Sequence, residues 1–268
     1  MELLSLFQDK LKTEETASEH YAQKWDERAE RFYDAQKEGR KDLQEAVVDF
    51  LKQKEIITKD STVLDIGAGA GRYTVPLAKE VKHIYGTDFS KNMVTYLERI
   101  KKEEAITNMT TRQLAWPTTE EVEPVDVVFS AMCPCTRSRK ALEQISEVAN
   151  EYGVIAQMTK MSDDITDELI AKGQVKRNPK DPHNNRDLAL SYFGLLWELG
   201  FEPEINFIVD SYEAKMTEED AWEHYQQRYE HVDEKLLKDT IEKRVEQDQV
   251  KIQRMTRLAL ITWATKVK

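Results

Sequence analysis

The chain has 268 residues, and its 50 acidic and 39 basic side chains give a formal net charge of −11. This length suits one large domain with attachments, and it can bury a core without disulfides or a structural metal. The negative charge disfavours a nucleic-acid or anionic-membrane partner. The longest apolar run, residues 258–264, is too short to span a bilayer. The N-terminus lacks a basic n-region and only two cysteines occur, so we expect a cytoplasmic protein.

The first fifty residues predict helices ahead of the first strand. Apolar residues recur at helical spacing between Tyr21 and Leu51, and Gly39 predicts a break between two helices. Tyr21, Trp25 and Phe32 fall near one helix face, which either core packing or closure over a ligand would explain. We therefore treat residues 1–56 as a helical segment that is a candidate lid.

The next hundred residues alternate between short β-branched runs and helical stretches. The predicted strands are 63–66, 83–87, 109–114, 125–131 and 153–158, and the predicted helices are 73–80, 91–102 and 138–152. Such alternation is typical of parallel βαβ units with helices on both faces of a sheet. The pattern predicts a doubly wound α/β domain that begins at about residue 57.

The remaining chain predicts a short helix over 165–172, a helix over 188–199 that ends at Gly200, and strands over 204–209 and 258–264. Residues 217–253 are highly charged and contain neither glycine nor proline, which predicts helix. We therefore expect a helical insertion at about 213–254 in a domain that spans 57–268. Solvent-exposed helices, a homodimer contact and coverage of a pocket are the alternative roles for this insertion.

Three of the nine glycines fall within five residues, in Asp65-Ile66-Gly67-Ala68-Gly69-Ala70-Gly71. A glycine cluster between a strand and a helix is typical of a loop that lies against a ligand, because glycine tolerates positive φ and close approach. We expect uncovered backbone N–H groups there, whereas an ordinary tight turn would need only one glycine. Arg72 stands where the dinucleotide fingerprint has its third glycine, which weakens a nicotinamide interpretation.

Two carboxylates accompany the glycine cluster. Asp88 ends the second predicted strand, 88 − 67 = 21 residues after Gly67, where a carboxylate can accept hydrogen bonds from both hydroxyls of a ribose. A helix cap is the alternative role for Asp88. Asp65 lies within the first apolar strand, and an ionised side chain there costs free energy unless it has a partner.

These residues resemble the class I S-adenosylmethionine-dependent methyltransferases, in which the first strand leads into Asp-h-Gly-x-Gly-x-Gly as residues 65–71 do here. The resemblance covers about residues 61–158. It implies a mostly parallel, Rossmann-like sheet of seven strands whose last strand is antiparallel. It also implies S-adenosyl-L-methionine as the cofactor and S-adenosyl-L-homocysteine as the product.

The same resemblance implies a set of site residues. Asp65 would help to hold the methionine ammonium group and Asp88 would hold the ribose, while Phe89 and Met93 would pack on the adenine. Donor and acceptor would meet after the fourth strand. In chain order, the residues implied to bind the cofactor are Tyr21, Trp25, Asp65, Gly67, Ala68, Gly69, Gly71, Asp88, Phe89, Met93, Leu114, Ala115, Trp116 and Ser130.

Two features depart from the family pattern. No aspartate follows the third predicted strand, so adenine recognition would fall to Gln113, to backbone atoms near Leu114 and Ala115, or to stacking on Trp116. No Asn/Asp-Pro-Pro-Tyr/Phe motif follows the fourth strand, which argues against methylation of an amide-like or base amino nitrogen.

The turn after the fourth strand reads Cys133-Pro134-Cys135-Thr136. Its Pro-Cys resembles that of RNA cytosine-C5 methyltransferases, in which a thiolate adds to the base and activates its C5 carbon. The acidic net charge and the absence of a cysteine in the next strand favour a loop that lines the acceptor pocket instead. A metal site would need two further ligands, and only His183 is a nearby candidate, so we expect no metal.

The predicted function is therefore in-line methyl transfer from S-adenosylmethionine to a small-molecule acceptor. A sulfonium already carries a strong leaving group, so such an enzyme mainly positions the reactants and excludes water. A general base is not essential, and His183 and His20 are the candidates if one is used. The alternatives are an RNA cytosine-C5 methyltransferase that uses Cys135 and a non-catalytic cofactor-binding module.

Overall fold

The computed structural model describes residues 7, 11, 19–176, 178, 181–229 and 231–266. The chain divides into two compact units. The first comprises Met1–Gln157, Asp187–Ile208 and Ala259–Lys268, and the second comprises Met158–Arg186 and Val209–Leu258. None of the helices in the described part of the chain is both long and apolar enough to cross a bilayer.

From residue 19 on, the helices α2 (Glu19–Asp26), α3 (Ala29–Glu38) and α4 (Asp42–Gln53) precede the first strand. The predicted break at Gly39 is confirmed, since Gly39 has extended backbone and caps α3. A second break separates α2 from α3. The Asp26 carboxylate at the end of α2 accepts hydrogen bonds from Ser90 Oγ and the Asn92 N–H, so a distant contact fixes where this helix ends.

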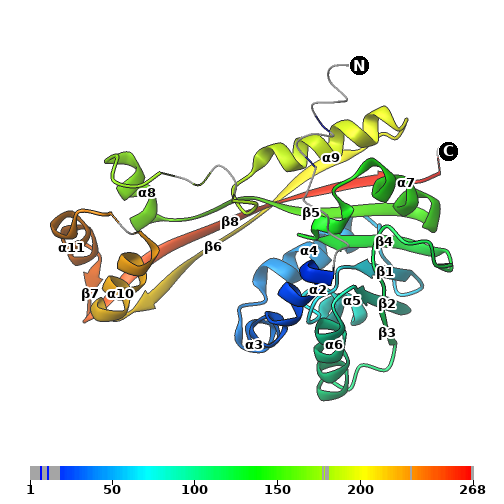
Figure 1. The fold of residues 1–268 in the computed structure, drawn as a ribbon, viewed down its shortest axis with the longest axis horizontal. Helices are drawn as coiled ribbons and strands as arrows, with labels where there is room; N and C mark the ends of the chain where they lie inside the picture. Colours follow the sequence, from blue (N-terminus) through cyan, green and yellow to red (C-terminus); the bar gives the residue numbers. More distant parts are fainter. Residues whose placement is uncertain are drawn as a thin grey trace. The chain divides into compact units, whose positions relative to one another are not determined.

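Figure 1 shows a central sheet whose strands are ordered β3-β2-β1-β4-β5-β8-β6, with β7 paired to β8. Neighbouring strands from β3 to β5 are parallel. β8 runs antiparallel to β5, because Thr265 N–H donates to the Glu151 carbonyl whereas Thr159 Oγ1 donates to the Arg257 carbonyl. The strands are β1 (Thr62–Ile66), β2 (His83–Asp88), β3 (Met109–Gln113), β4 (Val125–Ala131), β5 (Ala149–Asp163), β6 (Glu204–Met216), β7 (Val245–Glu246) and β8 (Gln249–Ala264).

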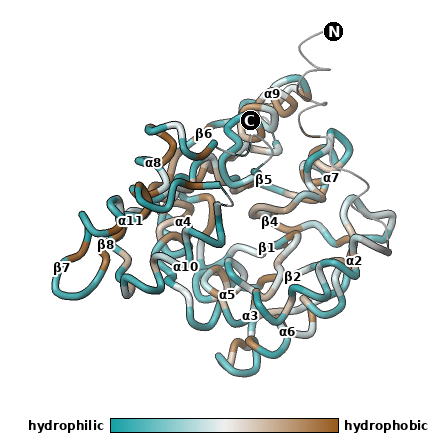
Figure 2. Tube along the Cα trace, turned by 60° about the vertical axis from the view of Figure 1, so that its left-hand side comes forward, coloured by the Kyte–Doolittle hydropathy of each residue, from teal (hydrophilic) through white to brown (hydrophobic). Residues whose placement is uncertain are grey.

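Helices cover both faces of the parallel part of the sheet, as predicted. α5 (Thr74–Ala78) and α6 (Lys91–Glu103) pack on the face that carries Gly86, where an added Cβ would meet Leu97 at 2.8 Å. Leu64 and Val128 face the other way, into a core shared with α7 (Arg139–Val148) and α9 (Arg186–Glu198). Apolar residues recur along β1 and β4, whereas α6 is largely hydrophilic (Figure 2). The sheet order reverses between β1 and β4, where doubly wound folds bind ligands.

Strands β5, β6 and β8 extend well beyond their predicted bounds. The predictions followed continuous apolar runs, but exposed and half-buried residues alternate along much of β6. Such a strand buries only one of its faces, so every second residue is polar. It therefore contains no continuous apolar run by which it could be predicted.

The second unit has its own core around α8 (Asp164–Ala171), α10 (Glu218–Arg228) and α11 (Glu234–Glu242). Helix was predicted throughout 217–253, and this is wrong after α11. Gln247 and Asp248 have positive φ of 53° and 61° and form the turn between β7 and β8. Val250 and Ile252, both fully buried, show the two-residue period of a strand, a weak signal beside so many charges.

Candidate active site

The glycine loop connects β1 to α5. Gly67, Gly69 and Gly71 have φ of 72°, 55° and 92°, so the cluster is needed for its backbone conformation. The expectation of uncovered N–H groups is wrong here, because Gly67 and Ala68 donate to the Thr87 carbonyl at 2.8 and 2.9 Å, and Gly71 donates to Ala68. The loop folds back onto the end of β2, and Gly69 N–H donates to the Asp88 carboxylate. The N–H groups of these three glycines and of Ala68 are therefore engaged within the protein, and the glycines give the loop a backbone shape that a ligand can approach closely.

Asp88 joins this loop to the start of α6. Its Oδ2 accepts from the Gly69 N–H at 3.0 Å and its Oδ1 from the Ser90 N–H at 2.9 Å. Each oxygen keeps a further acceptor position, so the carboxylate can still receive ribose hydroxyls. Burial raises the pKa of Asp88 to about 6, although the N–H groups of Ser90 and Gly69 act in the opposite direction.

Asp65 lies beneath the loop and is 2% exposed. Its Oδ2 accepts from Thr74 Oγ1 at 2.6 Å, which ties β1 to α5. Burial raises the pKa of Asp65 to about 7; the Thr74 bond opposes this shift and the negative charge of Asp88 adds to it. Among the described side chains, no cation forms an ion pair with Asp65 or Asp88. Two neighbouring carboxyls without a cation suit a ligand that brings a positive charge and hydroxyl donors.

The helix α2 lies against the start of α6. Tyr21 stacks on Phe89 with ring centroids 5.8 Å apart and an 18° angle between planes, and Trp25 meets Tyr21 edge-on. Trp25 Nε1 is buried without a hydrogen-bond partner, which leaves a donor free for a ligand. The structure thus brings together three residues that the sequence predicted from distant segments.

The ends of β2 and β3 supply further predicted residues. The nearest atom to a Cβ added at Gly69 would be Met93 Sδ at 3.9 Å, so the loop has room beside it. The Leu114 N–H donates to the Asp88 carbonyl, and Gln113 Nε2 donates to the Phe89 carbonyl. Ala115 is exposed.

The expected stacking of Trp116 on the adenine is not compatible with the structure. Trp116 is 4% exposed, belongs to the core beneath α7, and donates from Nε1 to the Ala141 carbonyl at 3.3 Å. Its ring is therefore engaged in core packing and is not open for stacking on adenine. The prediction failed because position after a strand does not show which way a large side chain turns.

The end of β4 completes the arrangement. Ser130 Oγ donates to the Ile66 carbonyl at 2.8 Å, and Cys133 packs so closely on Gly67 that an added Cβ would lie 2.4 Å from its Sγ. Cys133 and Cys135 are free thiols with sulfurs 2.7 Å apart. The Cys133 contact and burial raise the pKa of Cys135 well above its usual value. A neutral thiol is a poor nucleophile, which counts against the cytosine-C5 alternative.

The two histidine candidates belong to different parts of the chain. His183 belongs to the second unit, where its Nδ1 lies 3.0 Å from Asp181 Oδ1 in a loop. His20 is in α2, but its side chain lies outside the described part of the structure. Within the described residues, no group of three or more His, Cys, Asp or Glu side chains could hold a metal ion.

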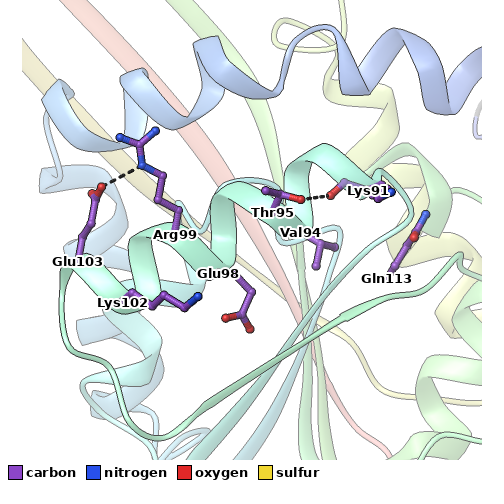
Figure 3. A pocket seen from close by; sticks show the side chains of 8 residues that line it. All are labelled: Lys91, Val94, Thr95, Glu98, Arg99, Lys102, Glu103 and Gln113. Carbon is purple, nitrogen blue, oxygen red and sulfur yellow. Dashed lines mark hydrogen bonds and ion pairs between the residues drawn. The ribbon is translucent and has the colours of Figure 1, made fainter.

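A hollow of about 510 Å³ lies on the outer side of α6, next to Gln113 (Figure 3). Two of its acidic side chains are engaged: Glu103 pairs with Arg99 at 3.0 Å, and Glu98 pairs with the neighbouring Lys101. The Tyr33 hydroxyl and then Arg99 lower the pKa of Glu103 to about 2. The acidic side chains of this hollow are therefore already paired within the protein.

Sequence reasoning missed Thr74 and Asp26 as parts of the site, and it placed Cys133 only in a loop expected to line the acceptor pocket, without its contact with Gly67. Thr74 and Asp26 act through side-chain hydrogen bonds to Asp65 and Ser90, and Cys133 acts by contact with Gly67. A threonine after a glycine cluster was visible in the sequence, but a partner 64 positions away, as for Asp26 and Ser90, was not.

Comparison with known proteins places this arrangement in a family. Residues 57–189 match the family model described as a methyltransferase domain. An uncharacterized protein from Haemophilus influenzae is 33% identical over 82 residues, which are 30% of this chain and 31% of that protein. The alignment thus spans less than a third of that relative.

Two solved structures resemble the fold. Precorrin 8W decarboxylase from Methanobacterium thermoautotrophicum has a TM-score of 0.52 and 12% identity, and the match covers 81% of this chain and 89% of that one. DhpI in complex with SAM and HEP has a TM-score of 0.50 and 18% identity, with 73% and 94% covered. The strand order, the glycine loop joined to Asp88 and the matched family model agree. Residues 57–189 are a methyltransferase domain of the class I family, whose cofactor is S-adenosylmethionine.

Proposed function

We propose that the protein is an enzyme that transfers a methyl group from S-adenosylmethionine to a small-molecule acceptor. One observation supports this above all: the positive-φ glycine loop is held to Asp88, and both Asp88 and Asp65 are buried with no cationic partner among the described side chains. The ammonium and ribose hydroxyls of the cofactor are the complementary groups. When bound, the cofactor supplies an electrophilic methyl group on a sulfonium centre.

The residues of this chain have three tasks in that reaction. Asp88 accepts the ribose hydroxyls, and Asp65 attracts the ammonium group through the oxygen that does not bond Thr74. Phe89 and Met93 enclose the adenine side. Tyr21 and Trp25 of α2 form the lid over Phe89, which excludes water and places aromatic faces near a cation. Positioning and water exclusion are the main contributions that such a displacement needs.

Calorimetry with S-adenosylhomocysteine tests the cofactor site. We expect Asp88→Asn to weaken binding at least about tenfold, because a hydrogen bond to a charged acceptor is lost. Asp126→Asn is the matched control, since Asp126 accepts from the Thr62 N–H and hydroxyl at the opposite end of the strands. That variant should lose stability and keep its affinity. Equal affinity in wild type and Asp88→Asn would refute the site.

Turnover tests the reaction itself. The full chain is incubated with methyl-labelled S-adenosylmethionine and a low-molecular-weight cell extract, and label in small products is measured. We expect transfer by wild type and its loss in Asp88→Asn. Label that appears only in added RNA, and that disappears in Cys135→Ala, would replace this proposal with the cytosine-C5 alternative.

A further inference from the structure

The turn after β4 carries an arginine next to the candidate active site. The short helix η1 (Pro134–Thr136) is closed by a bond from the Arg137 N–H to the Pro134 carbonyl at 3.1 Å. Arg137 therefore lies within one tight turn of Cys133, which packs on Gly67. The negative charge of Asp88 also acts on Cys135 in the middle of this turn. The turn thus stands beside the glycine loop, on the β4 side where the acceptor is expected.

Arg137 has no partner for its charge. Its Nε is buried without a hydrogen bond, and none of the described side chains forms an ion pair with its guanidinium. Arg139, two residues later, differs in this respect, since its Nε pairs with Glu143 Oε1 at 2.9 Å. A guanidinium stays charged at any physiological pH, and leaving one half-buried and unpaired costs free energy. Such a group is ready for an anion from outside the chain.

The neighbours of Arg137 do not neutralise it. Tyr192 of α9 is 1% exposed and its hydroxyl lies 3.0 Å from Thr136 Oγ1. Burial raises the pKa of Tyr192, and the positive charge of Arg137 acts against that rise. Tyr192 is therefore an uncharged side chain close to the Arg137 guanidinium. Since none of the described side chains forms an ion pair with Arg137, an anionic ligand is the complementary group for its charge.

We propose that Arg137 binds a carboxylate of the methyl acceptor, so that the substrate class is small carboxylic acids. This inference rests on the proposed function and names its substrate class. The planar guanidinium offers parallel N–H donors that match a carboxylate, which fixes the orientation of the acceptor as well as its affinity. Arg137 is then the residue that determines specificity for an acid over its amide.

The test uses the full chain saturated with S-adenosylhomocysteine. Acetate, succinate and benzoate are titrated by calorimetry against acetamide, succinamide and benzamide, and phenyl phosphate separates a carboxylate site from a phosphoryl site. We expect at least one acid to bind, its amide to bind at least about tenfold more weakly, and Arg137→Gln to lose the acid by a similar factor. Arg139→Gln is the matched control and should bind like wild type.

A second readout separates binding from a structural role. Because the unpaired Arg137 guanidinium contributes no stability to the free protein, Arg137→Gln should melt at or above the wild-type temperature and keep the wild-type affinity for S-adenosylhomocysteine. Binding of none of the acids, binding of phenyl phosphate alone, equal acid binding by Arg137→Gln, or a lowered melting temperature would each overturn this inference alone. Failure of wild type to bind S-adenosylhomocysteine would overturn the proposed function as well.

Discussion

Glu168 of the second unit and the Asp65 and Asp88 carboxyls of the first unit lie in opposite electrostatic environments. In the second unit, Glu168 pairs with Lys172 at 2.6 Å and with Arg244 at 3.0 Å. Lys172 and Arg244 lower the pKa of Glu168 to about 2, although burial acts in the opposite direction. In the first unit, burial raises the pKa of Asp65 to about 7 and that of Asp88 to about 6. Paired carboxylates stabilise a fold, whereas buried unpaired ones cost stability and are expected at functional sites.

The largest expected difference between the units is in the stability cost of replacing a glycine by alanine. Gly67 in the first unit and Gly173 in the second share a φ of 72°. Gly173→Ala in the second unit should cost about 1 kcal/mol, because nothing lies within 4 Å of the new Cβ. Gly67→Ala should cost about 2 kcal/mol or more and abolish cofactor binding, because the new Cβ meets Cys133. Urea denaturation and calorimetry measure both effects. Equal costs would contradict the close packing of the glycine loop.

Cofactor affinity should fall as the pH is lowered from 8 to 5.5. Asp65 and Asp88 have raised pKa values of about 7 and about 6, so both are protonated at the lower pH in the free protein. An ammonium group and hydroxyl donors bind the ionised carboxylates, so each protonated carboxyl must release its proton on binding. For each proton released, the affinity falls up to about tenfold per unit that the pH is lowered. Titration with S-adenosylhomocysteine in buffers of different ionisation enthalpy measures the proton release. Binding without pH dependence would show that neither carboxyl meets the ligand.

The contribution of Glu168 to the stability of the second unit should fall at acidic pH, opposite to the contribution of Asp65 and Asp88 to the stability of the first unit. The lowered pKa of Glu168 contributes stability above its ordinary value of 4.5, and this is lost as the pH falls towards about 2. The raised pKa values of Asp65 and Asp88 instead make the free first unit more stable below neutral pH. Glu168→Gln should cost about 1 kcal/mol at pH 7, since solvent screens part of the pairing. A variant as stable as wild type would show that these ion pairs contribute nothing.

The smallest effect is expected for Cys135→Ser. Its thiol has a pKa well above the usual range and is neutral at pH 7, so the methylation of small acceptors should not depend on it. Transfer of label from S-adenosylmethionine measures this, with Cys133→Ser as the neighbouring control. Loss of transfer in Cys135→Ser, with unchanged cofactor affinity, would restore the thiol as a nucleophile.

The sequence by itself determined the parallel core, because β-branched runs and glycine clusters act locally. The strands near 63–66, 83–87 and 125–131 were placed within a residue or so, and Gly67, Gly69 and Gly71 have the positive φ that their clustering indicates. The hairpin of β7 and β8 was not predicted. The alternation of apolar and polar residues in this hairpin is hard to recognise, because charged residues lie among them that are favourable in a helix and tolerated in a strand.

Only the tertiary structure decided which groups lack a partner. Trp116 is in the core, and the amides of Gly67, Ala68 and Gly71 are satisfied. The pair of Arg139 with Glu143, four positions later, is visible in the sequence, whereas the unpaired state of Arg137 is not. Local propensity depends on neighbours along the chain. Desolvation and charge pairing depend on residues that folding brings together across tens of positions, and these forces set the chemistry of the site.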